Sequence, residues 1–233
     1  MNLVYEYFDD FISLFYPQLC AGCGQALNKG EEVICAFCRH YLPKTHFHLE
    51  RNNTIERHFW GRVSLERCAS CYFFQKGSRV QHLIHQLKYR GKTEVGLTIG
   101  KIYGADLLQS VDYRTVDVIV PVPLHKSKEL KRTYNQVDLF CEGLSAAMEK
   151  PWVKRGLERV TATETQTHKT RFERWKNVGT VFRVTNPVLL QGKHVLLADD
   201  VITTGSTLEA CAQSILAVPG TRVSLATIAC AVK

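Results

Sequence analysis

Hydrophobic and polar positions along the chain follow two different periods in alternation. Phe8, Phe11, Ile12 and Phe15 recur at i, i+3, i+4 and i+7, which is the spacing of one helix face, and the helix that they predict ends before Pro17. The same criterion predicts further helices over residues 80–87, 93–109, 137–148 and 206–218.

Strand patterns occur between these helices. The alternation over residues 63–74 predicts a strand, whereas the short apolar runs at 116–122 and 194–198 are typical of buried parallel strands. The remaining predicted strands cover residues 152–160, 178–184 and 222–232, and the first two of these flank a polar loop at 161–177. Strands that alternate with helices predict an α/β fold with a parallel sheet.

The chain has 233 residues, 45% of them hydrophobic, which is enough for one full core and a small accessory module. Residues 43–61 are polar and rich in histidine without a clear period, so we predict a linker there. This gives two units. Residues 1–61 hold the N-terminal helix, a cysteine-containing ribbon and the linker, and residues 62–233 form the main domain.

The net charge of +8 is concentrated in one region of the chain. Residues 1–60 carry five Lys and Arg against seven Asp and Glu, a net charge of −2, whereas residues 61–180 carry 21 against 12, a net charge of +9. A region that binds phosphates needs excess cations, whether the phosphates belong to a small molecule or to a nucleic acid. Charge alone does not distinguish these two ligands.

Neither a membrane span nor an export signal is visible in the sequence. No apolar stretch approaches the roughly 20 residues that cross a bilayer, and the first residues include Glu6, Asp9 and Asp10, where a signal peptide would carry Lys or Arg. We therefore expect a cytoplasmic protein. The nine cysteines are odd in number, and in this setting metal binding or reduced thiols are favoured over disulfides.

Four of the cysteines form two C-x-x-C pairs. Cys20 and Cys23 are separated from Cys35 and Cys38 by 11 residues, and glycines nearby ease the tight turns. Four thiolates at this spacing are typical of a closed tetrahedral Zn²⁺ site, which leaves no position for chemistry. We expect a structural role, because so small a module needs a metal to fold, and the ribbon could in addition dock a partner.

A third C-x-x-C, at Cys68 and Cys71, lies inside the predicted strand over 63–74. Residues three apart on a strand point to opposite faces, so their sulfurs cannot reach one ion. We expect packed thiols here, as we do at Cys141, Cys211 and Cys230 on apolar faces.

The most informative segment covers residues 195–207, where an apolar strand is followed by two acids, a loop of small residues and the start of a helix. Asp199 and Asp200 come at the carboxyl end of a parallel strand, which is where ligands bind in such sheets. The loop leads into a helix N-terminus, whose free N–H groups favour an anion. A ribose phosphate with Mg²⁺ would use both the acids and the loop. The alternative is an ordinary turn in which an aspartate only caps the helix.

This segment resembles the signature by which type I phosphoribosyltransferases bind 5-phosphoribosyl-1-pyrophosphate (PRPP). The resemblance implies that Asp199 and Asp200 are the catalytic residues and bind the ribose hydroxyls. It also implies that the 5′-phosphate is held by Thr203, Thr204, Gly205, Ser206 and Thr207.

Further segments resemble ComF proteins over nearly the whole chain. These segments are residues 87–91 (LKYRG), 120–124 (VPVPL), 134–136 (YNQ), 165–166 (TQ) and 174–178 (RWKNV). The resemblance implies a Rossmann-like type I phosphoribosyltransferase fold preceded by the cysteine ribbon. It also assigns cations to the diphosphate: Lys126, Lys128 and Arg132 after a strand, and Lys169, Arg171 and Arg174 in a loop that closes over PRPP. For any one of these cations, a solvated surface position is an equally good interpretation.

Two classes of function stay open. ComF proteins serve natural transformation, which implies a PRPP-binding module that handles single-stranded DNA with helicase-like partners. The alternative is an active phosphoribosyltransferase of nucleotide metabolism, in which the ribbon and residues 43–61 cover an acceptor. One further hypothesis is that the basic loop serves both PRPP and nucleic acid, with aromatic side chains as stacking faces.

Overall fold

The computed structural model describes residues 16–124, 134–160 and 181–231. The helix predicted over residues 8–15 lies outside these ranges. The helices are α2 (Ala36–Tyr41), α3 (Thr54–Phe59), α4 (Arg79–Tyr89), α5 (Glu94–Leu107), α6 (Val111–Arg114), α8 (Gln136–Met148), the 3-10 helix η2 (Pro187–Leu189) and α10 (Ser206–Leu216). The strands are β1 (Cys68–Phe74), β2 (Val118–Pro121), β3 (Leu157–Arg159), β4 (Phe182–Val184), β5 (His194–Ile202) and β6 (Arg222–Ala231).

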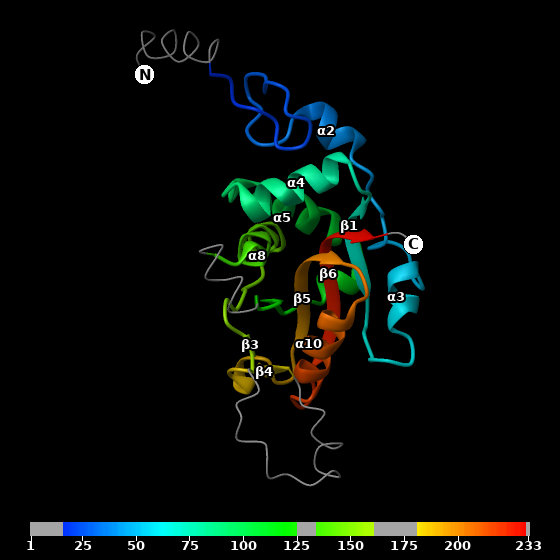
Figure 1. The fold of residues 1–233 in the computed structure, drawn as a ribbon. Coiled ribbons are helices and arrows are strands. Elements are labelled where there is room, and N and C mark those ends of the chain that lie inside the picture. Colours follow the sequence, from blue (N-terminus) through cyan, green and yellow to red (C-terminus); the bar gives the residue numbers. More distant parts are fainter. Residues whose placement is uncertain (1–15, 125–133, 161–180, 232–233) are drawn as a thin grey trace, which may run out of the picture.

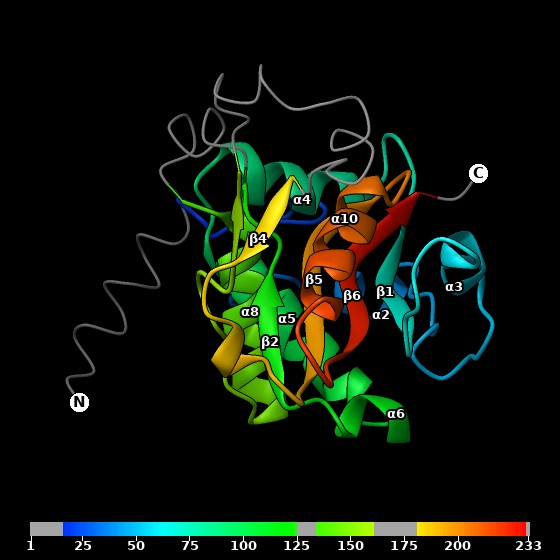
Figure 2. The same cartoon turned by 90° about the horizontal axis from the view of Figure 1, so that it is seen from below.

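The core is a four-stranded sheet in the order β1-β6-β5-β2, and every neighbouring pair in it is parallel. This confirms the α/β prediction (Figure 1). The two central strands are buried on both faces, and residues 195–198 of β5 are fully covered, as the continuous apolar run of the sequence indicates. In Figure 2, helices α5 and α8 lie on one face of the sheet and α10 covers the other.

Helices α5 and α8 approach each other backbone to backbone. A Cβ atom added at Gly100 would lie 2.3 Å from the carbonyl oxygen of Phe140, and one added at Gly143 would lie 2.3 Å from that of Leu97. Only glycine fits at such a crossing, because the obstructing atoms belong to the partner backbone. These two glycines set how closely the helix layer packs.

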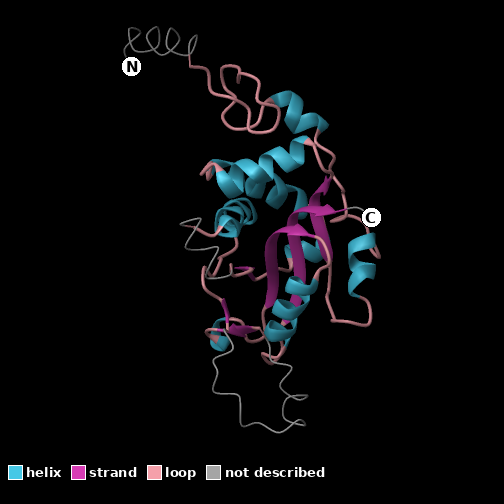
Figure 3. Ribbon diagram, in the orientation of Figure 1, coloured by secondary structure: helices cyan, strands magenta, loops and turns pink. Residues whose placement is uncertain are grey.

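The strands predicted over 152–160 and 178–184 are shorter than expected. Within them, β3 and β4 pair antiparallel in a separate two-stranded sheet, seen in Figure 3 beside the main one. Trp152 makes a single parallel bridge to Ile119 at the β2 edge. These two strands therefore lie outside the predicted parallel sheet, because two short strands that follow one another among the described elements can pair as an antiparallel ribbon.

The prediction of a linker over residues 43–61 was also wrong. Helix α3 forms there, and its buried Ile55 and Phe59 join the main core. Its start is capped by Asn53, whose Oδ1 accepts hydrogen bonds from the N–H groups of Ile55 (3.0 Å) and Glu56 (3.1 Å). The N-x-x-E pattern of Asn53 to Glu56 was the available sequence signal for this helix.

A buried ion-pair cluster ties α3 to the sheet. Arg67 is 5% exposed at the start of β1, and its Nε donates to Oε1 of Glu56 at 2.7 Å. Its Nη1 pairs with Asp112 of α6, and its Nη2 donates to the carbonyl oxygen of Glu50 at 2.7 Å. One guanidinium thus joins residues 50–56 and α6 to the start of β1.

Within the described part of the chain, no helix is long and apolar enough to cross a membrane.

Candidate ligand site and metal centre

The two acids of the predicted motif stand at the edge of an open cavity. Strand β5 continues past residue 198 to Ile202, so Asp199 and Asp200 lie in the C-terminal half of the strand and not in the loop that follows it. Both line a cavity of about 270 Å³ at the carboxyl end of the sheet. Asp200 is 8% exposed, and Asp199 is half-buried. The carboxylates therefore lie where the parallel topology places ligands.

Asp200 is held by two side chains from different helices. Nζ of Lys88, at the end of α4, lies 2.7 Å from Oδ2 of Asp200, and Nε2 of Gln136, at the start of α8, donates to the same oxygen at 2.6 Å. The backbone N–H of Asp200 donates to Oδ1 of Asp199 at 2.8 Å. The ammonium group offsets part of the negative charge that two adjacent carboxylates create.

Gln136 offers a second polar atom to this cavity. The residue is 2% exposed and lines the cavity, and its Oε1 is buried without a hydrogen-bond partner among the described residues. A buried acceptor with no donor is costly, and a ligand hydroxyl or ordered water is the usual partner. The side chain fits a ligand that carries hydroxyl groups, since a hydroxyl both donates and accepts.

The loop after β5 turns sharply into α10. Gly205 has φ +71°, in the left-handed region, and precedes the first residue of the helix. Thr207 lines the cavity of Asp199 and Asp200. Thr203, Thr204 and Ser206 line a second cavity on the other side. The predicted loop residues are thus divided between two adjoining cavities.

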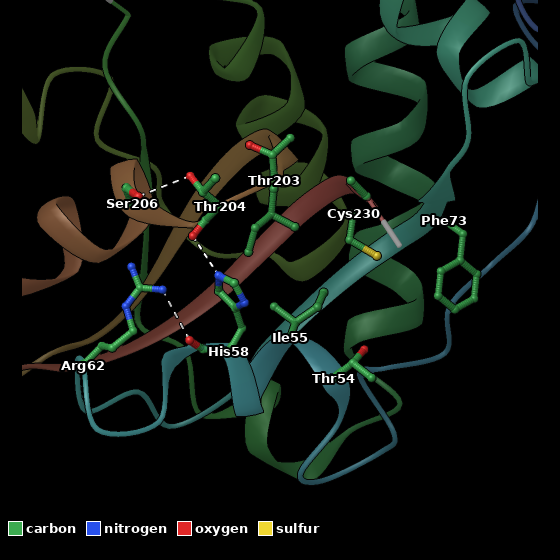
Figure 4. Close-up of a pocket in the computed structure, with 11 residues that line it drawn as sticks. Thr54, Ile55, His58, Arg62, Phe73, Thr203, Thr204, Ser206 and Cys230 are labelled. Carbon is green, nitrogen blue, oxygen red and sulfur yellow. Dashed lines mark hydrogen bonds between the residues drawn. The ribbon is translucent and has the colours of Figure 1, made fainter. Parts of the chain in front are cut away.

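The second cavity has a volume of about 470 Å³ and lies between the loop and α3 (Figure 4). Nε2 of His58 lies 2.7 Å from the carbonyl oxygen of Thr204, so Nε2 carries the proton and donates. A Cβ atom at Gly205 would lie 2.8 Å from Cζ of Phe59. Helix α3 therefore contacts the loop directly and fixes its position.

The rest of this cavity is partly apolar. Ile55, Phe73, Ile202 and Cys230 contribute apolar surface from α3 and three strand ends. Arg62 donates from Nη1 to the carbonyl oxygen of His58 at 3.4 Å and forms an ion pair with Glu209 of α10. The sequence did not reveal this cavity, because residues 54–62 lacked a recognisable period.

Six predicted phosphate ligands lie outside the described residues: Lys126, Lys128, Arg132, Lys169, Arg171 and Arg174. The described residues next to these segments line the first cavity, since Leu124, Asn135 and Arg159 all belong to its wall. The sequence alone predicted no role for Lys88, Asn135 and Gln136, although all three lie in the segments that carry the family resemblance.

The four ribbon cysteines come together as a compact cluster. The sulfurs of Cys20, Cys23, Cys35 and Cys38 all lie within 4.8 Å of one another, and those of Cys23 and Cys35 are 3.8 Å apart. A tetrahedral zinc site with Zn–S bonds of about 2.3 Å has sulfur–sulfur edges of about 3.8 Å. The geometry is therefore compatible with a structural metal ion such as zinc.

Backbone N–H groups support negative charge on one member of this cluster, Cys20. Burial raises the pKa of Cys20, but hydrogen bonds from the N–H groups of Cys35, Cys23 and Gly22 outweigh it and lower that pKa to about 6. The N–H of Cys35 donates to Sγ of Cys20 at 3.3 Å. A thiolate at this position suits metal binding, since the thiolate is the ligand.

The third C-x-x-C pair makes no such cluster. Cys68 and Cys71 are buried in β1, and burial raises the pKa of both thiols. Among the described residues, the ribbon cysteines are the one group that could hold a metal ion. Cys68 and Cys71 are packed thiols, as predicted.

No protein-family model matches the chain. It is 26% identical over 200 residues to the competence protein ComFC of Bacillus subtilis, which covers 85% of this chain and 78% of that protein. It is 32% identical over 130 residues to competence protein F of Haemophilus influenzae, which covers 54% and 57%. It is 30% identical over 209 residues to the DNA utilization protein YhgH of Escherichia coli K12, which covers 88% and 87%. The chain belongs to the ComF family.

This ComF protein also resembles solved structures. Over 62% of its length it follows 30% of a glutamine PRPP amidotransferase from Bacillus subtilis, with a TM-score of 0.42 and 18% identity. That enzyme was solved in complex with ADP and GMP. The likeness concerns the path of the chain alone.

Proposed function

We propose that this ComF protein binds PRPP together with Mg²⁺ in the cavity of Asp199 and Asp200. One observation carries the proposal: two carboxylates near the end of a parallel strand line a cavity, and that strand then leads through a glycine turn into a helix N-terminus. The acids accept hydrogen bonds from the ribose hydroxyls, and the N–H groups at the start of α10 bind the 5′-phosphate.

Two neighbours of Asp200 take part in binding. Oε1 of Gln136, which lacks a partner among the described residues, accepts from a ribose hydroxyl. Lys88, now paired with Asp200, supplies positive charge to a ligand of high negative charge. Mg²⁺ neutralises phosphate oxygens when it is bound. Lys126, Lys128, Arg132, Lys169, Arg171 and Arg174 meet the diphosphate in this proposal.

A thermal-shift titration tests the proposal. PRPP with Mg²⁺ should raise the melting temperature in a saturable manner, because a ligand that binds only the folded state stabilises it. Ribose 5-phosphate or pyrophosphate alone should raise it less, since each contacts only part of the site. A shift that is the same for pyrophosphate as for PRPP would show that the ribose is not recognised.

We further propose that PRPP binding serves the uptake and use of DNA in the cytoplasm. The support is that the similar proteins are named competence and DNA utilization proteins. A helicase-like protein that handles the same single strand is the expected partner. In a naturally transformable host, loss of the gene should lower transformation, and an Asp199→Asn copy should fail to restore it. Full restoration of transformation by the Asp199→Asn copy would show that DNA uptake does not require PRPP binding.

A second candidate function is ribose transfer, and the cavity against α3 favours it. An acceptor would need a pocket next to the ribose, and the cavity of about 470 Å³ adjoins the same loop at Thr203 and Thr204. Its partly apolar wall and its hydroxyl groups suit a flat heterocycle. Incubation with Mg²⁺, PRPP and a panel of bases and amines should then release pyrophosphate, and Asp199→Asn with Asp200→Asn should abolish the release. If no acceptor supports pyrophosphate release, PRPP binding without ribose transfer remains as the function.

We propose Zn²⁺ as the ion of the cysteine cluster. Four thiolates with tetrahedral spacing and no vacant position suit zinc in a structural role. The purified protein should contain one zinc per chain by elemental analysis, and Cys20→Ser with Cys38→Ser should lose it. Iron in place of zinc in the purified protein would show that the assignment of zinc is wrong.

A further inference from the structure

The cavity between α3 and the loop after β5 has one histidine in its described wall, His58. We propose that this cavity takes a neutral nitrogen heterocycle with a ring N–H, and that Nδ1 of His58 is the general base that removes its proton. The inference rests on the ribose transfer proposed above as the second candidate function. It adds the class of acceptor and one catalytic residue to that function.

The charge of the cavity wall favours a neutral acceptor. Among the described residues of the wall, Arg62 is the only Lys or Arg, and none is an Asp or Glu. The guanidinium of Arg62 already forms an ion pair with Glu209 of α10, and its Nη1 donates to the carbonyl oxygen of His58 at 3.4 Å. An anionic acceptor would have to compete with Glu209 for this cation, whereas a neutral acceptor leaves the pair intact.

The rest of the wall suits a flat ring with polar substituents. Ile55, Phe73 and Ile202 supply apolar surface, and the hydroxyl groups of Thr54 and Thr203 lie among them in a cavity of about 470 Å³. Apolar walls with a few polar groups are typical of small-molecule sites. A hydroxyl both donates and accepts, so it can pair with either kind of substituent on a heterocycle.

Contacts with the loop fix the place and the tautomer of the His58 ring. Nε2 lies 2.7 Å from the carbonyl oxygen of Thr204, which can only accept, so the neutral ring keeps its lone pair at Nδ1. Nδ1 has no hydrogen-bond partner among the described residues. Cδ2 lies 3.4 Å from a Cβ atom added at Gly205, and Figure 4 shows the ring between the loop and Ile55. The ring is therefore held in place with one nitrogen still able to accept a proton.

The core supports this arrangement from below. The ring of Phe59 meets that of His58 edge to face, with 5.8 Å between the centroids, and Phe59 is 1% exposed. A base whose position is set by a second group and by packing is the arrangement that general-base catalysis requires. Binding of the 5′-phosphate by the loop would place the ribose next to this base, because Thr203 and Thr204 line the same cavity.

The proposed step moves one proton and one electron pair. A ring nitrogen of the acceptor attacks C1 of the ribose, the bond from C1 to the diphosphate oxygen breaks, and its electron pair leaves with pyrophosphate. The proton of the attacking nitrogen passes to Nδ1 of His58 and from there to water. A neutral heterocycle needs this base because its nitrogen gains positive charge as the new bond forms. General-base catalysis of this kind contributes about 10²–10⁴-fold to a rate.

Pyrophosphate release by the full chain with Mg²⁺, PRPP and one acceptor at a time tests the inference. Adenine, hypoxanthine and uracil are the neutral acceptors, and orotate and nicotinate are the anionic ones. At least one neutral acceptor should give a higher kcat/KM than either anion. His58→Gln, whose amide can still donate to Thr204, should lower kcat at least about 100-fold and leave the PRPP-induced thermal shift in place. His82→Gln, at an exposed position of α4, is the matched control and should change neither.

Two further measurements separate a base from a residue that only anchors the loop. The kcat of the wild type should fall towards acidic pH, because a protonated imidazole cannot accept a proton, and the residual kcat of His58→Gln should lack this fall. Added imidazole should restore part of the turnover of His58→Ala. It should not restore that of His58→Gln, where the longer side chain fills the place of the ring.

Three results would overturn the inference. Wild-type kcat in His58→Gln would exclude the base, loss of PRPP binding in that variant would leave the residue as an anchor of the loop, and preference for orotate or nicotinate would contradict the class of acceptor. Failure of the underlying function has a different signature. In that case PRPP still raises the melting temperature, but the wild type releases no pyrophosphate with any acceptor.

Discussion

Nζ of Lys88 lies 2.7 Å from Oδ2 of Asp200, although the two residues belong to elements that are far apart in sequence. The side chains are 19% and 11% exposed, so the pair is largely shielded from water. It brings the end of α4 into the cavity at the carboxyl edge of β5. A PRPP molecule that enters this cavity meets an acid and a cation that are already positioned.

Changing Lys88 to Met should weaken PRPP binding about tenfold, the effect of one charge-assisted contact. The reason is that the ligand loses a cation and meets an Asp200 carboxylate without its ion-pair partner. Calorimetric titration would measure the effect, with Lys101→Met on the exposed side of α5 as the control. Unchanged or tighter binding in Lys88→Met would show that the lysine only blocks the empty site.

Replacing Gly205 with Ala should cost about 2 kcal/mol or more in the free energy of unfolding and abolish the PRPP-induced thermal shift. The added methyl meets both a left-handed backbone and the ring of Phe59 at 2.8 Å. Gly192→Ala is the matched control, since Gly192 has φ +69° but no atom within 4 Å of the added methyl. Chemical denaturation should show a cost of about 1 kcal/mol there, with ligand binding intact. Equal effects of the two changes would mean that the contact with α3 is unimportant.

Changing Arg67 to Leu should lower the free energy of unfolding by about 3–5 kcal/mol, because Glu56 and Asp112 lose the guanidinium that neutralises them. Urea denaturation would measure this. The exposed pair of Arg183 and Glu158 provides the comparison: Arg183 is 70% exposed, and Arg183→Leu should change stability by less than about 1 kcal/mol. A small effect at Arg67 would contradict its role in joining α3 to the sheet.

Acidification from pH 7.5 to 5.5 should destabilise the protein through its buried histidines. Burial and the charge of Arg222 lower the pKa of His194, and burial lowers that of His48. The unfolded chain therefore binds protons near pH 6.5 that the folded chain does not, so stability falls as the pH drops through that value. Each histidine contributes up to about 1.4 kcal/mol per pH unit. His194→Asn should flatten the dependence measured by denaturation at several pH values, and an unchanged slope would count against the assignment.

The sequence was sufficient to predict the core and the place of the acids. Long apolar runs predict buried parallel strands, and topology places Asp199 and Asp200 at the ligand edge without any knowledge of contacts. The cysteine cluster was equally predictable, since its ligands are close in sequence.

Apolar runs and sheet topology predict neither helix α3, for which the N-x-x-E pattern at its start was the available signal, nor the neighbours of Asp200. Helix α3 buries only two side chains, and its position depends on Arg67 and on the loop at Gly205. The hydrogen bond that joins α3 to this loop connects His58 with Thr204, which are 146 residues apart in the sequence. Gln136 reaches Asp200 over 64 residues of sequence. Helical periodicity predicts which side of a helix is buried, but not which distant polar group a buried glutamine meets.

Isothermal titration of the full chain with PRPP in the presence of Mg²⁺ tests the central claim most directly. The wild-type protein should bind one PRPP per chain, and changing Asp199 and Asp200 to Asn should weaken binding by a factor of at least about 100, since two charge-assisted contacts are lost. Binding to ribose 5-phosphate should be weaker than to PRPP in the wild type. No heat of binding, or equal affinity in the wild type and the double variant, would contradict the assignment of this cavity as a PRPP site.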